Sequence, residues 1–149
     1  MTKTPIPDVS SRPHALSVNH SFPFPPEILG SAWTEKFDTW FAAPGFLFMK
    51  AEVNAPFFFE VHAQEHRHPH YGRFLRLEQD KVVELTWVTG TGGTKGAETV
   101  VTVEFNPSDD GTDLHLHHAG FADEQSMQQH AEAWPYVLDQ LEQRLIELE

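Results

Sequence analysis

The sequence contains no cysteine among its 149 residues. This absence excludes disulfide bonds, thiolate metal sites and a cysteine nucleophile, and nothing marks the chain for an oxidising compartment. Basic residues are scarce, with 10 Lys and Arg against 22 Asp and Glu and a formal net charge of -12. A surface of this charge repels phosphate backbones and anionic lipids, so we expect neither nucleic acid nor membrane as a partner.

Long apolar runs are also missing. The run around Phe57-Phe58-Phe59 is far too short to span a bilayer, and the N-terminal stretch MTKTPIPDVSSRP lacks the apolar centre of a signal peptide. We therefore expect a cytoplasmic protein. The hydrophobic fraction of 40% and the twelve phenylalanines are typical of a globular domain, and the length suits one hydrophobic core.

The composition changes after residue 13. Residues 1–13 hold three prolines and no periodic apolar pattern, which predicts a flexible N-terminal tail. Residues 14–149 are expected to form a single domain. Residues 14–22 alternate in polarity and predict a strand, and the prolines that follow favour two short helices at 26–32 and 34–42. Ala43-Pro44-Gly45 ends the helical part, and alternating segments predict strands at 46–53, 56–63, 67–78, 81–89, 97–106 and 112–119.

The C-terminal segment from Asp123 to Glu149 has the spacing of an amphipathic helix. Its apolar stripe recurs every three or four residues, at Met127, His130, Trp134, Val137, Leu138, Leu141, Leu145 and Leu148. Asp123 is a suitable N-cap, and Pro135 is expected to kink the helix near residues 131–135. A sheet with one apolar face and a helix with one apolar stripe can bury these surfaces against each other, so the predicted fold class is α+β.

Several motifs resemble one known family. They are Trp40-Phe41 before Ala43-Pro44-Gly45, Glu84-Leu85-Thr86-Trp87, the run GTDLHLHHAGF at 111–121, and His130 four residues before Trp134. In this order they are similar to the activator of heat-shock-protein-90 ATPase homologue family, within the START-like, SRPBCC or Bet v 1-like superfamily. The resemblance covers about residues 15–148. It implies a helix-grip fold, in which a curved antiparallel sheet of about seven strands wraps a long C-terminal helix and two short helices follow the first strand.

Two positions depart from the family pattern. Ala133 stands where the family often has glycine before the tryptophan, and Asn54-Ala55-Pro56-Phe57-Phe58 replaces a glycine pair. Because phenylalanine fills space that glycine leaves open, the ligand preference of another member is not transferred. Chaperone activation belongs to multi-domain members, so a chaperone contact is retained only as an alternative.

The resemblance implies an apolar cavity between the sheet and the last helix. We predict that it binds a small apolar or aromatic molecule, without a cofactor, in a monomer or weak dimer. The residues predicted to contact this ligand are Phe59, His70, Tyr71, Phe74, Trp87, Leu116, His118, Met127, His130 and Trp134. Phe46 or Phe48 is also expected to point inward.

Two alternatives stay open. One is an enzyme of the polyketide-cyclase or hydrolase type, with His118 and Tyr71 as acid-base groups. The other is a regulatory module that contacts a chaperone. His118 shares the parity of Leu114 and Leu116 and points inward, either as a structural histidine bonded to main chain or to His130, or as a functional one.

The run HAQEHRHPHYGRF at 62–74 carries histidines at positions 62, 66, 68 and 70. His66, His68 and His70 project from one strand face, and two imidazoles at i and i+2 could share a metal ion if His115 and His117 supplied a third ligand. Pro69 interrupts the strand and the outward face is solvent, so we expect no physiological metal site. The alternative is a polar rim at the cavity mouth, with Gly72 allowing a bulge or close approach. TGTGGTKG at 89–96 predicts a flexible hairpin rather than a phosphate-binding loop.

Overall fold

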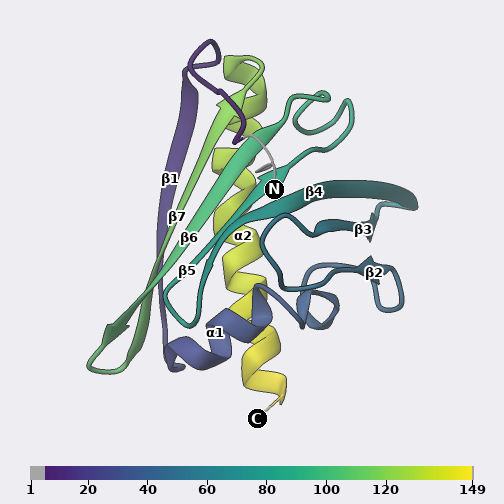
Figure 1. Ribbon diagram of the computed structural model, residues 1–149. Helices are drawn as coiled ribbons and strands as arrows, with labels where there is room; N and C mark the ends of the chain where they lie inside the picture. The colour runs from purple at the N-terminus through teal and green to yellow at the C-terminus, as the bar shows by residue number, and fades with distance from the viewer. Residues whose placement is uncertain (1–5, 149) are drawn as a thin grey trace.

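The computed structural model describes residues 6–148, and its main feature is one seven-stranded antiparallel sheet. The strand order is β1-β7-β6-β5-β4-β3-β2 (Figure 1). The strands are β1 (His14–Phe22), β2 (Leu47–Phe48), β3 (Pro56–Ala63), β4 (His66–Glu78), β5 (Val82–Trp87), β6 (Thr99–Ser108) and β7 (Gly111–Phe121). The helices are α1 (Pro26–Ala32) and the long α2 (Glu124–Leu148), with a 3-10 turn at Phe37–Thr39 between α1 and β2. This arrangement confirms the helix-grip fold.

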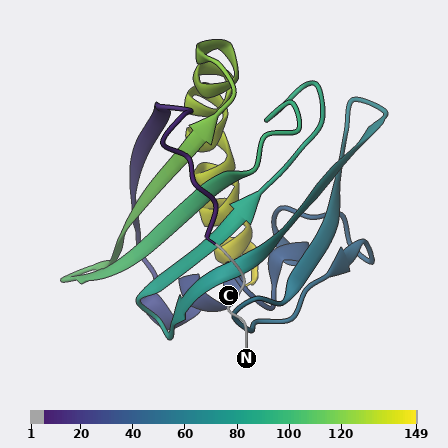
Figure 2. The same ribbon diagram turned by 45° about the horizontal axis from the view of Figure 1, so that its top comes forward.

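The sheet curves around α2. Figures 1 and 2 show α2 running along one face of the sheet, while β4, β3 and β2 turn away from the long strands. α1 lies near one end of β6 and β7. No helix within residues 6–148 is long and apolar enough to cross a membrane.

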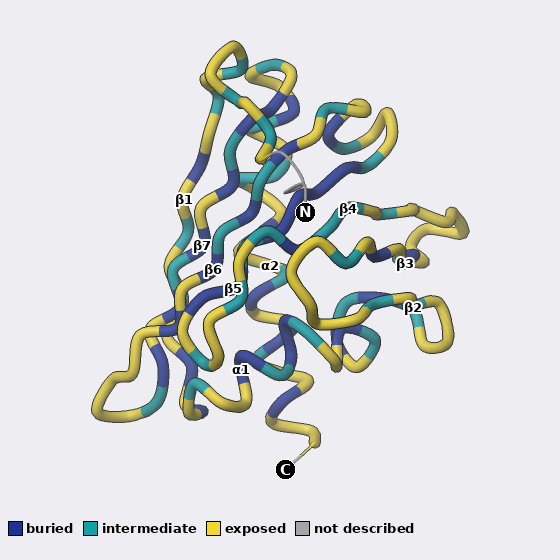
Figure 3. The backbone as a smooth tube through the Cα atoms, viewed as in Figure 1, coloured by how far each residue is buried: buried dark blue, intermediate teal, exposed yellow. Residues whose placement is uncertain are grey.

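Alternating burial along the strands places the core on the face that meets α2. Buried, intermediate and exposed segments alternate along the long strands (Figure 3). On β6, Thr99, Val101, Val103 and Phe105 are buried, while Glu104 is exposed. Val83, Leu85 and Trp87 are buried on β5 beside them. The apolar stripe of α2 meets this face through Trp134, Leu138, Leu141 and Leu145, each at most 9% exposed. Burial of these paired faces is the main source of stability for the fold.

The start of α2 follows the sequence prediction. The carboxylate of Asp123 accepts a hydrogen bond from the backbone N–H of Ser126 at 2.8 Å, which is the expected N-cap. Pro135 lies inside the helix and is exposed. The kink expected there stays a prediction.

The segment between α1 and β3 differs from the prediction. In place of a helix over 34–42, only the 3-10 turn forms, because its aromatic rings pack inward and Trp40 Nε1 donates to the Ala32 carbonyl at 2.7 Å. The expected strand 46–53 is reduced to β2. Phe46 and Phe48 are 42% and 71% exposed, so neither points inward. The parity was wrong by one residue, since Leu47 pairs with inward-facing Phe59.

The N-terminal segment is partly attached to the sheet. Residues 1–5 of the expected tail lie outside the described residues. Further along, the Arg12 side chain donates to the carbonyls of Gly120 at 2.7 Å and Glu98 at 2.8 Å. The tail therefore has an anchor one residue before its expected end at Pro13.

Candidate functional site

A cavity of about 590 Å³ lies between α2, the hairpin of β3 and β4, and the loop that follows β5. Gly90, Thr91, Gly92 and Ala133 are exposed, so the cavity opens to solvent there. Its walls are largely apolar or aromatic, with a few imidazole and hydroxyl groups. The lining residues are Phe41, Val61, Arg67, His68, Pro69, His70, Trp87, Thr89, Gly90, Thr91, Gly92, Gly93, His130, Ala133, Trp134 and Val137.

Four of the ten predicted ligand contacts lie in this wall, namely His70, Trp87, His130 and Trp134. Phe59, Phe74, Leu116 and His118 are fully buried behind it. Met127 is half-buried and packs against the core. These five are not lining residues, and whether any of the nine contacts a ligand stays a prediction.

Tyr71 is the exception among the predicted contacts. It is 53% exposed and is absent from the cavity wall. Successive residues of a strand face opposite sides, and Tyr71 pairs with the exposed Phe58, whereas the neighbouring His70 pairs with buried Phe59. Its expected place in the cavity is corrected to the outer face of the sheet.

His118 is held in a closed chain of hydrogen bonds. Trp134 Nε1, which can only donate, reaches His118 Nδ1 at 3.1 Å, so His118 Nε2 carries the proton and donates to Thr99 Oγ1 at 2.7 Å. Thr99 Oγ1 then donates to the Trp87 carbonyl. Complete burial holds the pKa of His118 well below its usual value, so the ring is neutral. With both nitrogens satisfied, His118 supports Trp134 in the cavity wall and has no free atom for acid-base work.

His70 lies flat against the core and faces the cavity. Its ring stacks on Phe59, with centroids 4.8 Å apart, and meets Trp87 edge-on at 5.2 Å. Its Nδ1 is 2.9 Å from the carbonyl oxygen of His68 and must donate, since a carbonyl only accepts. Burial lowers the pKa of His70 to about 4, against the opposing effect of that hydrogen bond. His70 is therefore neutral at physiological pH, with an unprotonated Nε2.

His130 presents the same arrangement from α2. Its Nδ1 is 2.8 Å from the Ser126 carbonyl, one helical turn earlier, so Nδ1 again carries the proton. Burial lowers the pKa of His130. Within residues 6–148, the Nε2 atoms of His70 and His130 have no hydrogen-bond partner. The cavity wall thus holds two imidazoles that burial keeps neutral, one from β4 and one from α2, beside the exposed His68.

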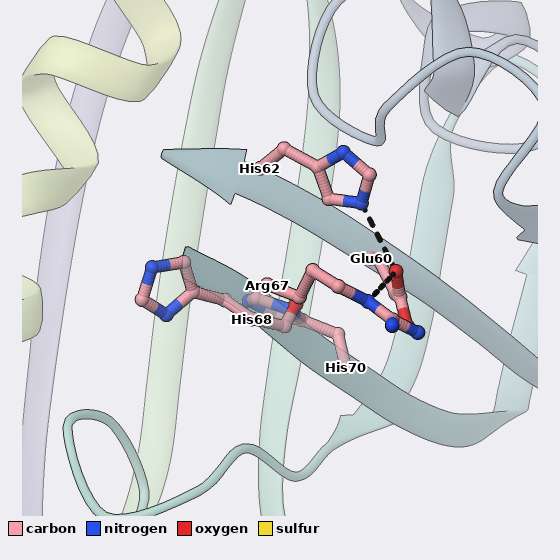
Figure 4. Close-up of polar contacts among 5 residues, drawn as sticks. All are labelled: Glu60, His62, Arg67, His68 and His70. Carbon is pink, nitrogen blue, oxygen red and sulfur yellow. Dashed lines mark hydrogen bonds and ion pairs between the residues drawn. The ribbon is translucent and has the colours of Figure 1, made fainter. Parts of the chain in front are cut away.

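The remaining histidines of the 62–74 run divide between the two faces of the hairpin. Gln64 and Glu65 form its turn with positive φ, which places His62 on the opposite face from His68 and His70. Glu60 accepts hydrogen bonds from Arg67 at 3.0 and 2.7 Å and pairs with His62 at 3.0 Å (Figure 4). These bonds lower the pKa of Glu60 to about 2. This ion cluster joins β3 to β4 at the edge of the cavity, where Arg67 forms part of the wall and Glu60 and His62 do not.

The metal interpretation lacks a third ligand. The sheet order places β6 and β5 between β7, which carries His115 and His117, and β4. β7 and β4 are therefore three strand spacings of about 4.8 Å apart, which is too far for histidines of both strands to bind one metal ion. Among residues 6–148, no group of three His, Cys, Asp or Glu side chains could hold a metal ion. The outward placement of the run was wrong, because His68 and His70 line the cavity.

Hydrogen bonds and an ion pair hold the glycine-rich loop at 89–96 in place. Thr94 Oγ1 accepts from the Thr89 amide at 2.9 Å, and Thr89 Oγ1 accepts from the Thr94 amide at 2.6 Å. Ser126 Oγ donates to the Gly93 carbonyl at 2.6 Å, and Lys95 pairs with Asp123 at 2.9 Å. These bonds fasten the loop to the start of α2, in contrast to the flexible hairpin expected from its composition.

Sequence reasoning missed several wall residues. Phe41, half-buried, stacks on Trp87 with an interplanar angle of 8° and centroids 5.8 Å apart. The sequence did single out Phe41, because it belongs to the Trp40-Phe41 motif. The helix predicted over 34–42, however, did not indicate which way its side chain points. The signals for the other two were weaker. Val61 alternates with outward-facing residues on its strand, and Val137 belongs to the apolar stripe of α2.

Comparison with known proteins agrees with this geometry. The family model described as Activator of Hsp90 ATPase homolog 1-like protein matches residues 23–145. A search of curated proteins finds no match.

Solved structures share the fold. Protein MLL2253 from Mesorhizobium loti is 23% identical with a TM-score of 0.75, over 91% of this chain and 98% of its own. CalU16 from Micromonospora echinospora is 22% identical with a TM-score of 0.69, over 87% of this chain and 74% of its own. DynU16, a putative protein in the dynemicin biosynthetic locus, is 16% identical with a TM-score of 0.75, over 89% of this chain and 47% of its own. The family match spans most of the sequence, and the chain therefore belongs to the Activator of Hsp90 ATPase homolog 1-like family.

Proposed function

We propose that this protein binds a small apolar or aromatic molecule in the cavity between its sheet and α2. The observation that carries the proposal is an open cavity of about 590 Å³ walled by Phe41, Trp87 and Trp134. Pockets of 300–1,000 Å³ with apolar walls and a few polar groups are the usual form of small-molecule sites. The aromatic core fills the space behind the wall and leaves this volume open toward solvent.

The geometry favours binding over the acid-base chemistry considered from the sequence. Of the two groups then assigned to catalysis, His118 has both nitrogens occupied and Tyr71 lies on the outer face. The chaperone contact suggested by the family description stays a prediction that no described feature favours.

A cavity-blocking variant tests the proposal. Ala133 lines the cavity from an exposed position of α2, so Ala133→Phe should fill the mouth. Glu132→Phe adds the same ring to the neighbouring position, which is exposed and outside the wall. Thermal-shift screening with naphthalene, indole and biphenyl should stabilise the wild type and Glu132→Phe but not Ala133→Phe. If none of these compounds, nor any of a wider aromatic set, raised the melting temperature of the wild type, binding in this cavity would be excluded.

A further inference from the structure

The hydrogen-bonding character of the cavity narrows the class of ligand beyond size and apolarity. Three histidines line the cavity: the exposed His68, and two half-buried rings, His70 from β4 and His130 from α2. In both rings Nδ1 donates to a main-chain carbonyl, at 2.9 Å for His70 and 2.8 Å for His130. A main-chain carbonyl has no proton to give, so the tautomer follows from geometry alone. Each ring then presents Nε2 as an acceptor.

These acceptors have no partner of their own. Among residues 6–148, neither Nε2 atom is hydrogen-bonded. Both residues are half-buried and neither Nε2 is among the fully buried unpartnered atoms, so each is open to the cavity. A ligand that excludes water from the cavity has to replace the hydrogen bond that water can donate to these atoms. Since both histidines line the cavity, the donor has to come from its contents.

The surroundings disfavour an anionic ligand. Arg67 is engaged by both carboxylate oxygens of Glu60, and Lys95 is paired with Asp123 and Gln125. In the glycine-rich loop, the amides of Gly93, Thr94 and Lys95 already donate within the loop. The net charge of the chain is -12. A carboxylate entering the cavity would lose its hydration without gaining a cation.

We propose that the cavity selects neutral ligands that donate a hydrogen bond, such as phenols and amides, through the free Nε2 atoms of His70 and His130. The proposal rests on the proposed function, because it names the chemistry of a ligand for the same cavity. It is independent of the fold family, since it follows from two carbonyl contacts and two unpaired nitrogens. Burial, which keeps both rings neutral by lowering their pKa values, supports it.

A matched set of naphthalenes separates donor recognition from simple apolar binding. The four probes are naphthalene, 2-naphthol, 2-methoxynaphthalene and 2-naphthoate, titrated near pH 7 by calorimetry. We expect 2-naphthol to bind about fivefold to tenfold more tightly than 2-methoxynaphthalene, the effect of one hydrogen bond of ~1 kcal/mol. 2-Naphthoate should bind most weakly.

Variants assign the effect to the two rings. The double variant His70→Phe with His130→Phe keeps aromatic walls but removes both acceptors, so naphthalene should still bind while the preference for 2-naphthol disappears. His66→Phe is the control, because His66 lies on β4, is exposed and is outside the cavity wall. It should keep the wild-type preference.

The outcomes distinguish the two proposals. Equal binding of naphthalene, 2-naphthol and 2-methoxynaphthalene would overturn donor selection and leave the proposed function standing. Tightest binding of 2-naphthoate would also overturn donor selection. Failure of all four probes, together with a failed wider screen, would remove both proposals.

A ligand-free measurement covers the case in which the double variant does not fold. Nitrogen-15 spectra of the wild-type histidine side chains distinguish the two neutral tautomers. We expect His70 and His130 to carry their protons on Nδ1. A proton on Nε2 of both rings would overturn the proposal whatever the ligand binding shows.

Discussion

At the scale of single residues, the contacts of His118 favour the structural one of its two predicted roles, with Thr99 and Trp134 as partners in place of the expected main chain or His130. It accepts from Trp134 Nε1 and donates to Thr99, so His118→Ala leaves the Trp134 N–H without an acceptor in a fully buried site, while Thr99 keeps only its bond to the Trp87 carbonyl. We predict a loss of about 3 kcal/mol in the free energy of unfolding, from the cavity and the unpaired groups together. Urea denaturation measures it. His117→Ala, at the exposed neighbouring position, should change stability by no more than about 0.5 kcal/mol, and equal effects of the two substitutions would contradict this role.

His70 should make the fold sensitive to acid. Its pKa is about 4 in the folded protein against an ordinary value of 6.5, so between these pH values the unfolded chain binds more protons. Stability is therefore present above pH 6.5 and is lost as the pH falls toward 4, by at most about 3 kcal/mol from this group. His118 and His130 act in the same direction.

Denaturation curves between pH 7 and pH 4 check this linkage. His70→Phe should lose less stability across the window than the wild type, while the exposed control His66→Phe should follow the wild type. Parallel loss in all three proteins would show that His70 does not contribute to the acid sensitivity.

At the scale of elements, long periodic segments were predictable and short ones were not. α2 and β6 followed their polarity patterns because a single buried face fixes each of them. The segment from Thr34 to Val53 did not, since its aromatic rings are placed by contacts with β3, β5 and α2 rather than by local periodicity. A one-residue error in parity was enough to turn Phe46 and Phe48 from the core to solvent.

The loop at 89–96 gives an element-scale test with a matched pair of glycines. A Cβ at Gly93 would lie 1.9 Å from Thr89 Oγ1, whereas one at Gly92 would meet nothing within 4 Å. Gly93→Ala should break the Thr89–Thr94 bonds, loosen the link to Ser126 and cost about 1–3 kcal/mol. Gly92→Ala should be close to neutral. Thermal denaturation and hydrogen exchange at the Thr94 amide measure both, and similar results for the two variants would show that the loop is not held as described.

At the scale of the whole molecule, the sequence predicted the presence of a cavity better than its wall. Trp87, His130 and Trp134, which belong to the family motifs, line the cavity, and so does His70 of the histidine run. The opening of the cavity could not be predicted from the sequence. It depends on the hydrogen bonds that hold the glycine-rich loop at 89–96, and on the position of Phe41 after the 3-10 turn. The unpaired Nε2 atoms of His70 and His130 could not be predicted either. They result from hydrogen bonds between Nδ1 and main-chain carbonyls, and every residue type has such a carbonyl.

The four tryptophans give the most direct test of the central claim, that this cavity binds small aromatic molecules. Trp87 and Trp134 line the cavity, whereas Trp33 and Trp40 are buried outside its wall. The measurement is a titration with 2-naphthol, followed by the four indole N–H signals in nitrogen-15 spectra. We expect saturable shifts of the Trp87 and Trp134 signals with little change at Trp33 and Trp40. No shift of the Trp87 and Trp134 signals at saturating 2-naphthol, or equal shifts of all four, would contradict the claim.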